Sequence, residues 1–110
     1  MTFDDYQKQA LTTAVHHANP EMDKTIFALG IAGEAGEVIE KWKKIIAYRE
    51  GKITDEDLAE LSKELGDVLW YIAVFAHELG LSMSTIAQLN ADKLASRKAR
   101  NVIKGQGDNR

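Results

Sequence analysis

The sequence of 110 residues contains no cysteine and only one proline. The lack of cysteine excludes disulfide frameworks, thiolate metal sites and cysteine nucleophiles. The longest apolar run, Val68 to Ala76, is nine residues long, which is far too short to cross a membrane as a helix. The first residues show no basic stretch followed by an apolar one, so we expect no signal peptide. These absences predict one cytoplasmic domain, residues 1–110, with no membrane partner.

Charge is distributed unevenly along the chain. The net charge is −3, but residues 1–92 carry 16 acids and 8 bases, whereas residues 93–110 carry six bases and one acid. The acidic body lacks the broad basic face that a protein needs to bind duplex nucleic acid, so we expect no such partner. The asymmetry instead predicts that the body holds cations and the C-terminal stretch holds anions.

Helical signals dominate the sequence, and no segment alternates as a strand does. Thr2, Thr54 and a serine at 82 or 84 are candidate N-caps, and Gly80 is a helix stop. Residues 100–110 predict an irregular basic tail outside a helical core of about residues 3–99. The fold class is therefore all-α, a four-helix bundle. The expected helices run from Phe3 to about His17, from about Asp23 to about Tyr48, from Asp55 to about Leu79, and from residue 83 or 85 to about Ala99.

The third expected helix is apolar on nearly every side. Between Leu65 and Ala76 only Gly66 and Asp67 are not apolar or aromatic, and such a helix is normally buried all round. A single small bundle has little material to cover it. We therefore expect a dimer or a dimer of dimers, the alternative being a monomer in which this helix is central.

Two pairs of carboxylates stand on consecutive helices. Glu34 and Glu37 are three residues apart, as are Glu64 and Asp67, so each pair shares one helix face. Asp67 precedes the apolar run and should be partly buried, where a carboxylate needs a partner. Four hard oxygens without histidine or cysteine suit Mg²⁺ or Mn²⁺. The sequence therefore predicts a metal site, against the common alternative of a solvated acidic face.

Cationic residues follow the same helix faces. Lys44 lies on the stripe of Glu34 and Glu37. Asn90, Lys93 and Arg97 form a stripe on the fourth helix, where an ammonium and a guanidinium could hold polyphosphate, or where basic residues could simply suit the helix dipole. Tyr71 could stack on a base or fill the core.

These residues resemble a known family. Glu34-x-x-Glu37, followed after 26 residues by Glu64-x-x-Asp67, is similar to the signature of the MazG-like all-α nucleoside triphosphate pyrophosphohydrolases. The flanking sequences agree over about residues 25–97. The resemblance implies a helical bundle that assembles as dimers or tetramers. It also implies Mg²⁺-dependent hydrolysis of a (deoxy)nucleoside triphosphate to the monophosphate and pyrophosphate, as in the removal of unwanted nucleotides.

The resemblance also assigns roles to residues. It implies that Glu34, Glu37, Glu64 and Asp67 bind the metal. Lys93 and Arg97 match positions associated with the phosphates, and Tyr71 matches an aromatic position in the nucleotide pocket. Glu60 departs from the family, because some members carry a basic residue there; Lys44 or Lys63 would have to replace it.

The expected mechanism is attack of water on the α-phosphorus, with a carboxylate as the general base. Glu37 and Glu64 are the candidates for the base. The alternative function is a non-catalytic helical module of the same fold, which binds a nucleotide or a partner helix without hydrolysis.

Overall fold

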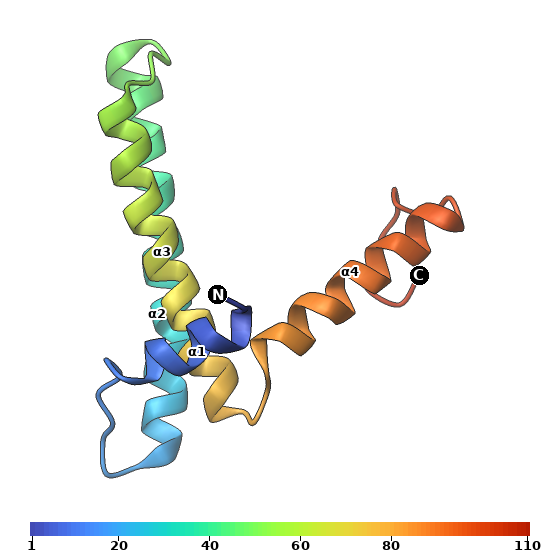
Figure 1. Cartoon of the computed structure of the whole chain (residues 1–110). Helices are drawn as coiled ribbons and strands as arrows, with labels where there is room; N and C mark the ends of the chain where they lie inside the picture. Colours follow the sequence, from blue (N-terminus) through green and yellow to red (C-terminus); the bar gives the residue numbers. More distant parts are fainter.

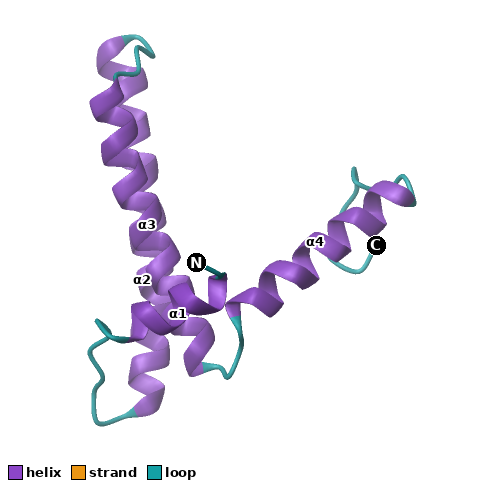
Figure 2. Cartoon of the chain, viewed as in Figure 1, coloured by secondary structure: helices purple, strands orange, loops and turns teal.

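Four helices and no strand make up the chain (Figure 1 and Figure 2). The computed structural model describes residues 1–110. The helices are α1 (Phe3–Leu11), α2 (Pro20–Arg49), α3 (Asp55–Glu78) and α4 (Met83–Ala99). The predicted all-α class is confirmed.

Side chains cap the helices as the sequence predicted. The Thr2 hydroxyl accepts the Asp5 N–H at 3.0 Å, and Thr54 caps α3 in the same way. Of the two serines considered for α4, Ser82 is the cap, because its hydroxyl accepts the Thr85 N–H. Each cap satisfies a backbone donor that has no partner inside its helix.

The predicted end of the first helix was wrong. We expected it near His17, but α1 ends at Leu11. The hydroxyls of Thr12 and Thr13 donate to the carbonyls of residues 9 and 10, and such local bonds compete with continuation of a helix. A loop of residues 12–19 therefore follows.

The second helix begins three residues earlier than the expected Asp23. Its N-cap is Asn19, whose side chain accepts the Glu21 N–H at 2.9 Å. Pro20 occupies the first helical position, where its missing N–H costs nothing. The only proline of the chain therefore marks the start of α2.

The long helices α2 and α3 form an antiparallel hairpin, α1 packs across its base, and α4 projects away from it (Figure 1). The axis of α4 is turned by 104° from that of α3, and α4 packs mainly against α1. The radius of gyration is 17.0 Å, compared with about 13 Å for a compact domain of this size. The four helices of one chain therefore do not close into a single bundle.

The core of the chain lies where α1 crosses the hairpin. Phe27, Val74 and Met83 are its larger buried side chains. Every residue of the apolar run of α3, which packs against α1 and α2, is buried or half-buried, but Asp67 directly before the run is not. That residue, which we expected to be partly buried, is exposed in the single chain.

Apolar side chains remain exposed along the hairpin and α4. No single helix is long and apolar enough to cross a membrane. Only α3 and α4 taken together, across the bend between them, have the length and apolar composition of a membrane span. The exposed apolar side chains are distributed over α2, α3 and α4. They include Leu29, Ile39, Trp42, Leu65 and Leu89.

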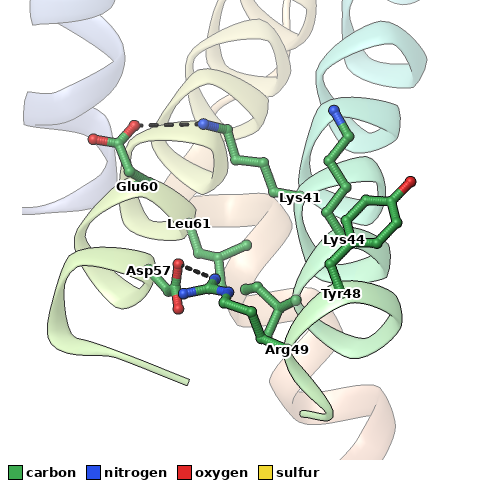
Figure 3. A pocket seen from close by; sticks show the side chains of 8 residues that line it. Lys41, Lys44, Tyr48, Arg49, Asp57, Glu60 and Leu61 are labelled. Atoms are coloured by element: carbon green, nitrogen blue, oxygen red, sulfur yellow. Dashed lines mark hydrogen bonds and ion pairs between the residues drawn. The ribbon is translucent and has the colours of Figure 1, made fainter. Parts of the chain in front are cut away.

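An ion pair ties the end of α2 to the start of α3 (Figure 3). Arg49 donates to the carboxylate of Asp57, which also accepts the Thr54 N–H at 2.9 Å. These bonds, that of Arg49 above all, lower the pKa of Asp57 from 3.8 to about 2. Because the folded pKa is the lower one, Asp57 stabilises the fold above pH 3.8, and this contribution is lost as the pH falls toward 2.

Asp57→Asn is therefore expected to lower the melting temperature by a few degrees at neutral pH and to have little effect near pH 2. Asparagine cannot carry the charge that Arg49 pairs with. Melting curves recorded by circular dichroism across this pH range should converge as the wild-type carboxylate becomes protonated. A difference that stays constant at every pH would contradict the assignment.

Candidate metal centre

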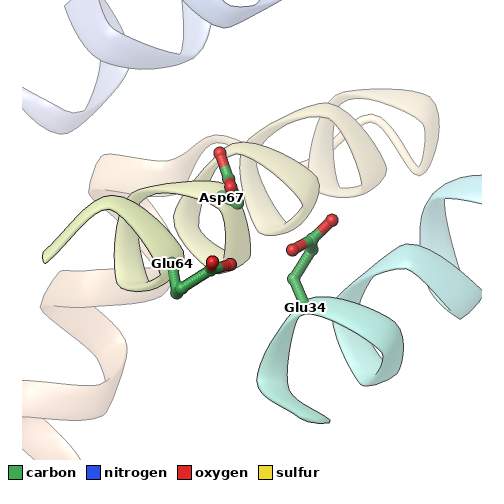
Figure 4. Close-up of side chains that lie close together, drawn as sticks. All are labelled: Glu34, Glu64 and Asp67. Atoms are coloured by element: carbon green, nitrogen blue, oxygen red, sulfur yellow. The ribbon is translucent and has the colours of Figure 1, made fainter. Parts of the chain in front are cut away.

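Three carboxylates meet between α2 and α3 (Figure 4). Glu34 comes from α2, and Glu64 and Asp67 come from α3; one oxygen atom of each lies within 4.8 Å of those of the other two. Glu64 and Asp67 share a face because they are three residues apart, and the antiparallel α2 places Glu34 opposite them. The structure therefore brings together three of the four carboxylates that the sequence singled out.

The electrostatics of this cluster favour a cation. Burial raises the pKa of Glu34, and the charges of Asp67 and Glu64 raise it further. Carboxylates this close repel one another unless positive charge lies between them. An oxygen-only donor set suits Mg²⁺ or Mn²⁺ better than zinc, so the residues present fit the predicted metal.

Glu37, the fourth predicted ligand, lies outside this group. It is exposed on α2, about one turn beyond Glu34, yet close enough for its charge to contribute to the raised pKa of Glu34. Its carboxylate is therefore available for a role other than joining the three-residue cluster.

Lys41 belongs to this site, although the sequence assigned it no role beyond its place on the stripe of Glu34 and Glu37. Its ammonium lies 3.4 Å from Glu64 and 3.4 Å from Glu60. The hydrogen bond to Glu64, the largest effect, raises the pKa of Lys41. Glu60 is therefore paired with cations from both helices, Lys41 of α2 at 3.4 Å and Lys63 of α3 at 2.9 Å. The signal was present, because position 41 is one turn after Glu37 on the acidic stripe.

A groove of about 290 Å³ begins at Lys41 and runs between the far ends of α2 and α3 (Figure 3). Lys44, predicted to bind substrate, lines it together with Tyr48 and Arg49. Since Lys41 contacts both the groove and Glu64, the groove adjoins the acidic cluster. Its three bases are accompanied by the acids Asp57 and Glu60. This juxtaposition of anionic and cationic groups suits a metal–polyphosphate complex.

Tyr71 packs across α2 one turn after Asp67. Its ring covers Gly30 and meets the ring of Trp70 edge to face, with centroids 5.0 Å apart. Of the two roles considered for Tyr71, packing against the core is therefore present. Stacking on a base stays a prediction.

The predicted residues of α4 lie apart from the carboxylates, because α4 leaves the hairpin (Figure 1). Asn90 and Lys93 line a separate cavity of about 350 Å³. The Arg97 side chain is only 6% exposed and donates to Asp108. Within one chain, these three residues do not reach the metal site. Asp108, the one acid of the basic tail, was given no role from the sequence.

Glu34→Gln is expected to raise the melting temperature of the metal-free protein and to abolish its rise with Mg²⁺. The substitution removes one of three repelling charges but also a metal ligand, whereas wild-type protein should gain several degrees at saturating Mg²⁺. Differential scanning calorimetry with EDTA and then with Mg²⁺ measures both effects. Equal responses of the two proteins to Mg²⁺ would rule out Glu34 as a ligand.

Comparison with known proteins identifies one family and one relative. Residues 23–102 match the family described as the MazG nucleotide pyrophosphohydrolase domain. The "Gene 37 protein" of Mycobacterium phage L5 is 44% identical over 114 aligned residues, which cover the whole of both chains. No solved structure shows significant similarity. The matched span contains α3, α4 and all but the first three residues of α2, and hence every residue of the carboxylate cluster.

Proposed function

Because the chain belongs to the MazG nucleotide pyrophosphohydrolase family, we propose that it hydrolyses a (deoxy)nucleoside triphosphate to the monophosphate and pyrophosphate with the help of Mg²⁺. The observation that carries the proposal is the convergence of Glu34, Glu64 and Asp67 beside the groove that begins at Lys41 and contains Lys44. The activity fits a cytoplasmic role in clearing unwanted nucleotides.

The three clustered carboxylates would hold the metal, with Mn²⁺ as a possible substitute. When bound, the ion would offset negative charge on the phosphates and favour ionisation of a water molecule. Lys41 would help to hold Glu64 in place through the ion pair at 3.4 Å. Lys44, on the adjoining groove, would contact phosphate oxygens.

Of the two candidate general bases, Glu37 fits the geometry better. Glu64 belongs to the cluster and is also paired with Lys41, whereas Glu37 stands outside it. In this mechanism Glu37 takes a proton from water as the water oxygen bonds to the α-phosphorus. The bond from that phosphorus to the oxygen bridging it to the β-phosphate breaks, and pyrophosphate leaves with the electron pair.

We further propose that the active form is a homodimer or homotetramer. A second chain would bury the apolar residues that are exposed on the hairpin and α4. It would also bring a carboxylate cluster to Asn90, Lys93 and Arg97, which do not reach the cluster of their own chain. Light scattering should then give a mass of two or four times 12.2 kDa. A 12.2 kDa particle at working concentration would contradict this arrangement.

Pyrophosphate release from a panel of canonical and modified nucleoside triphosphates, with Mg²⁺ and with EDTA, tests the function. We expect release of one pyrophosphate for each monophosphate formed, from at least one nucleotide, and none with EDTA. Tight nucleotide binding without release at any concentration of Mg²⁺ or Mn²⁺ would favour the non-catalytic module instead.

A further inference from the structure

The last eleven residues fold back on α4 as a C-terminal hook (residues 100–110). The Arg110 guanidinium closes the hook by donating to the carbonyls of Val102, Ile103 and Gly107. Arg100 in turn donates to the carbonyl of Arg110 at 2.9 Å. The segment that the sequence predicted to be irregular lacks a helix, but its polar groups are extensively paired. Such a segment holds its side chains in fixed positions.

The hook places one acid between two bases of α4. The Asp108 carboxylate accepts Lys93 Nζ at 2.8 Å and Arg97 Nη2 at 3.0 Å. Its backbone carbonyl accepts Arg97 Nη2 at 2.6 Å. The hydrogen bond from Lys93, followed by that from Arg97, lowers the pKa of Asp108. Asp108 is therefore anionic at neutral pH and bound from both sides.

The two bases are not equivalent. Arg97 is nearly buried, with a side chain 6% exposed, whereas the Lys93 side chain is 35% exposed and lines the cavity of about 350 Å³ beside Asn90. Arg97 offsets the charge of Asp108, so the group of three keeps one net positive charge. An ammonium has three N–H donors, and only one of those of Lys93 points to Asp108. Lys93 thus presents a fixed charge and two free donors to a ligand.

We propose that Asp108 is a positioning residue for the triphosphate site, acting through Lys93, with Arg97 as its buried anchor. The inference rests on the proposed function, because it assigns the ligand of Lys93 to the polyphosphate of that reaction. The opposing interpretation is that Asp108 blocks Lys93 and must be released before a ligand can bind. It fits less well, since release of Asp108 would leave the buried Arg97 charge unpaired.

A double-mutant cycle tests this inference. Asp108→Asn keeps the shape of the side chain and removes its charge, and Lys93→Ala removes the group on which it acts. Asp92→Asn is the matched control, since it removes one acidic charge from α4, the helix of Lys93, at a residue bonded to Gln88. We expect Asp108→Asn to raise KM for the nucleotide by about 5- to 10-fold with kcat within about twofold. The control should match wild type.

The cycle also separates positioning from other roles. If Asp108 acts through Lys93, adding Asp108→Asn to Lys93→Ala should cause no further rise in KM. The inference is overturned if the two substitutions act independently, or if Asp108→Asn leaves KM unchanged. It is also overturned if Asp108→Asn lowers KM, which is the result expected if Asp108 blocks Lys93. Circular dichroism of each variant checks that the helices remain folded.

Failure of the proposed function can be told apart from failure of this inference. If the wild type releases no pyrophosphate from any nucleotide, calorimetric titration with Mg²⁺–tripolyphosphate replaces the kinetic measurement. Positioning is then supported if Asp108→Asn weakens binding in the wild-type background but has no effect on binding in the Lys93→Ala background. Equal binding by wild type and Asp108→Asn overturns it.

Discussion

Asp67→Asn is expected to lower Mg²⁺-dependent pyrophosphate release by about two to three orders of magnitude, the effect of removing one preorganised electrostatic partner of a reacting group. Asp67 contributes one of three oxygens that lie within 4.8 Å of one another, and asparagine keeps its size but not its charge. Because Asp67 is exposed, the substitution should leave helical content unchanged. The loss can then be attributed to the site rather than to unfolding.

Initial rates over a range of Mg²⁺ concentrations measure this effect, with Asp92→Asn as the charge-matched control on α4. The activity of the Asp67 variant should recover only in part at high Mg²⁺, since two carboxylates of the cluster remain. Full activity at the wild-type Mg²⁺ requirement would refute the metal assignment.

Glu37→Gln separates the base from the ligands. If Glu37 accepts the proton, the variant should lose turnover but keep the rise in melting temperature with Mg²⁺. If Glu37 is a ligand, both should fall together, as expected for Asp67→Asn. The geometry favours the first result, because Glu37 stands outside the three-carboxylate cluster.

Features set by neighbours in the sequence could be predicted from it. The capping hydroxyls of Thr2 and Thr54 act on N–H groups three residues away, and Glu64 and Asp67 share a face through helix geometry alone. The two carboxylate pairs therefore identified both the helices and the likeness to the family. Local rules failed at the end of α1, where Thr12 and Thr13 form bonds that end the helix, and at the start of α2, which begins at Pro20.

Features set by the packing of distant segments could not be predicted in this way. Whether Asp67 is buried depends on what covers the second side of α3, and the direction of α4 depends on its 104° turn from α3. The partners of Arg97 depend on how the hook folds back to bring Asp108 to it. Helix periodicity carries no information on these contacts, since each joins residues on different elements or across a turn.

Lys41 is an intermediate case. Its place on the acidic stripe of α2 follows from spacing, but its bonds to Glu60 and Glu64 depend on the register of α2 against α3. That register is fixed in part by a close approach of the two helices at Gly30, where the Tyr71 ring fills the space that a side chain would occupy.

Gly30→Ala and Gly33→Ala are expected to shift stability in opposite directions. A Cβ at Gly30 would overlap the ring of Tyr71, whereas a Cβ at Gly33 would meet nothing within 4 Å. Replacing glycine by alanine inside a helix contributes up to about 1 kcal/mol. At Gly33 this gain stands alone, and the melting temperature should rise by several degrees.

At Gly30 the same gain is opposed by overpacking, which costs about 1–3 kcal/mol. Tyr71 has little room to move, because its ring meets that of Trp70 at a centroid distance of 5.0 Å. The melting temperature should therefore fall, and the near-ultraviolet circular dichroism of the aromatic residues should change only in this variant. KM for the nucleotide should rise as well, since Tyr71 is one turn from Asp67. Shifts of the same sign in both variants would show that Tyr71 does not fix the approach of α2 to α3.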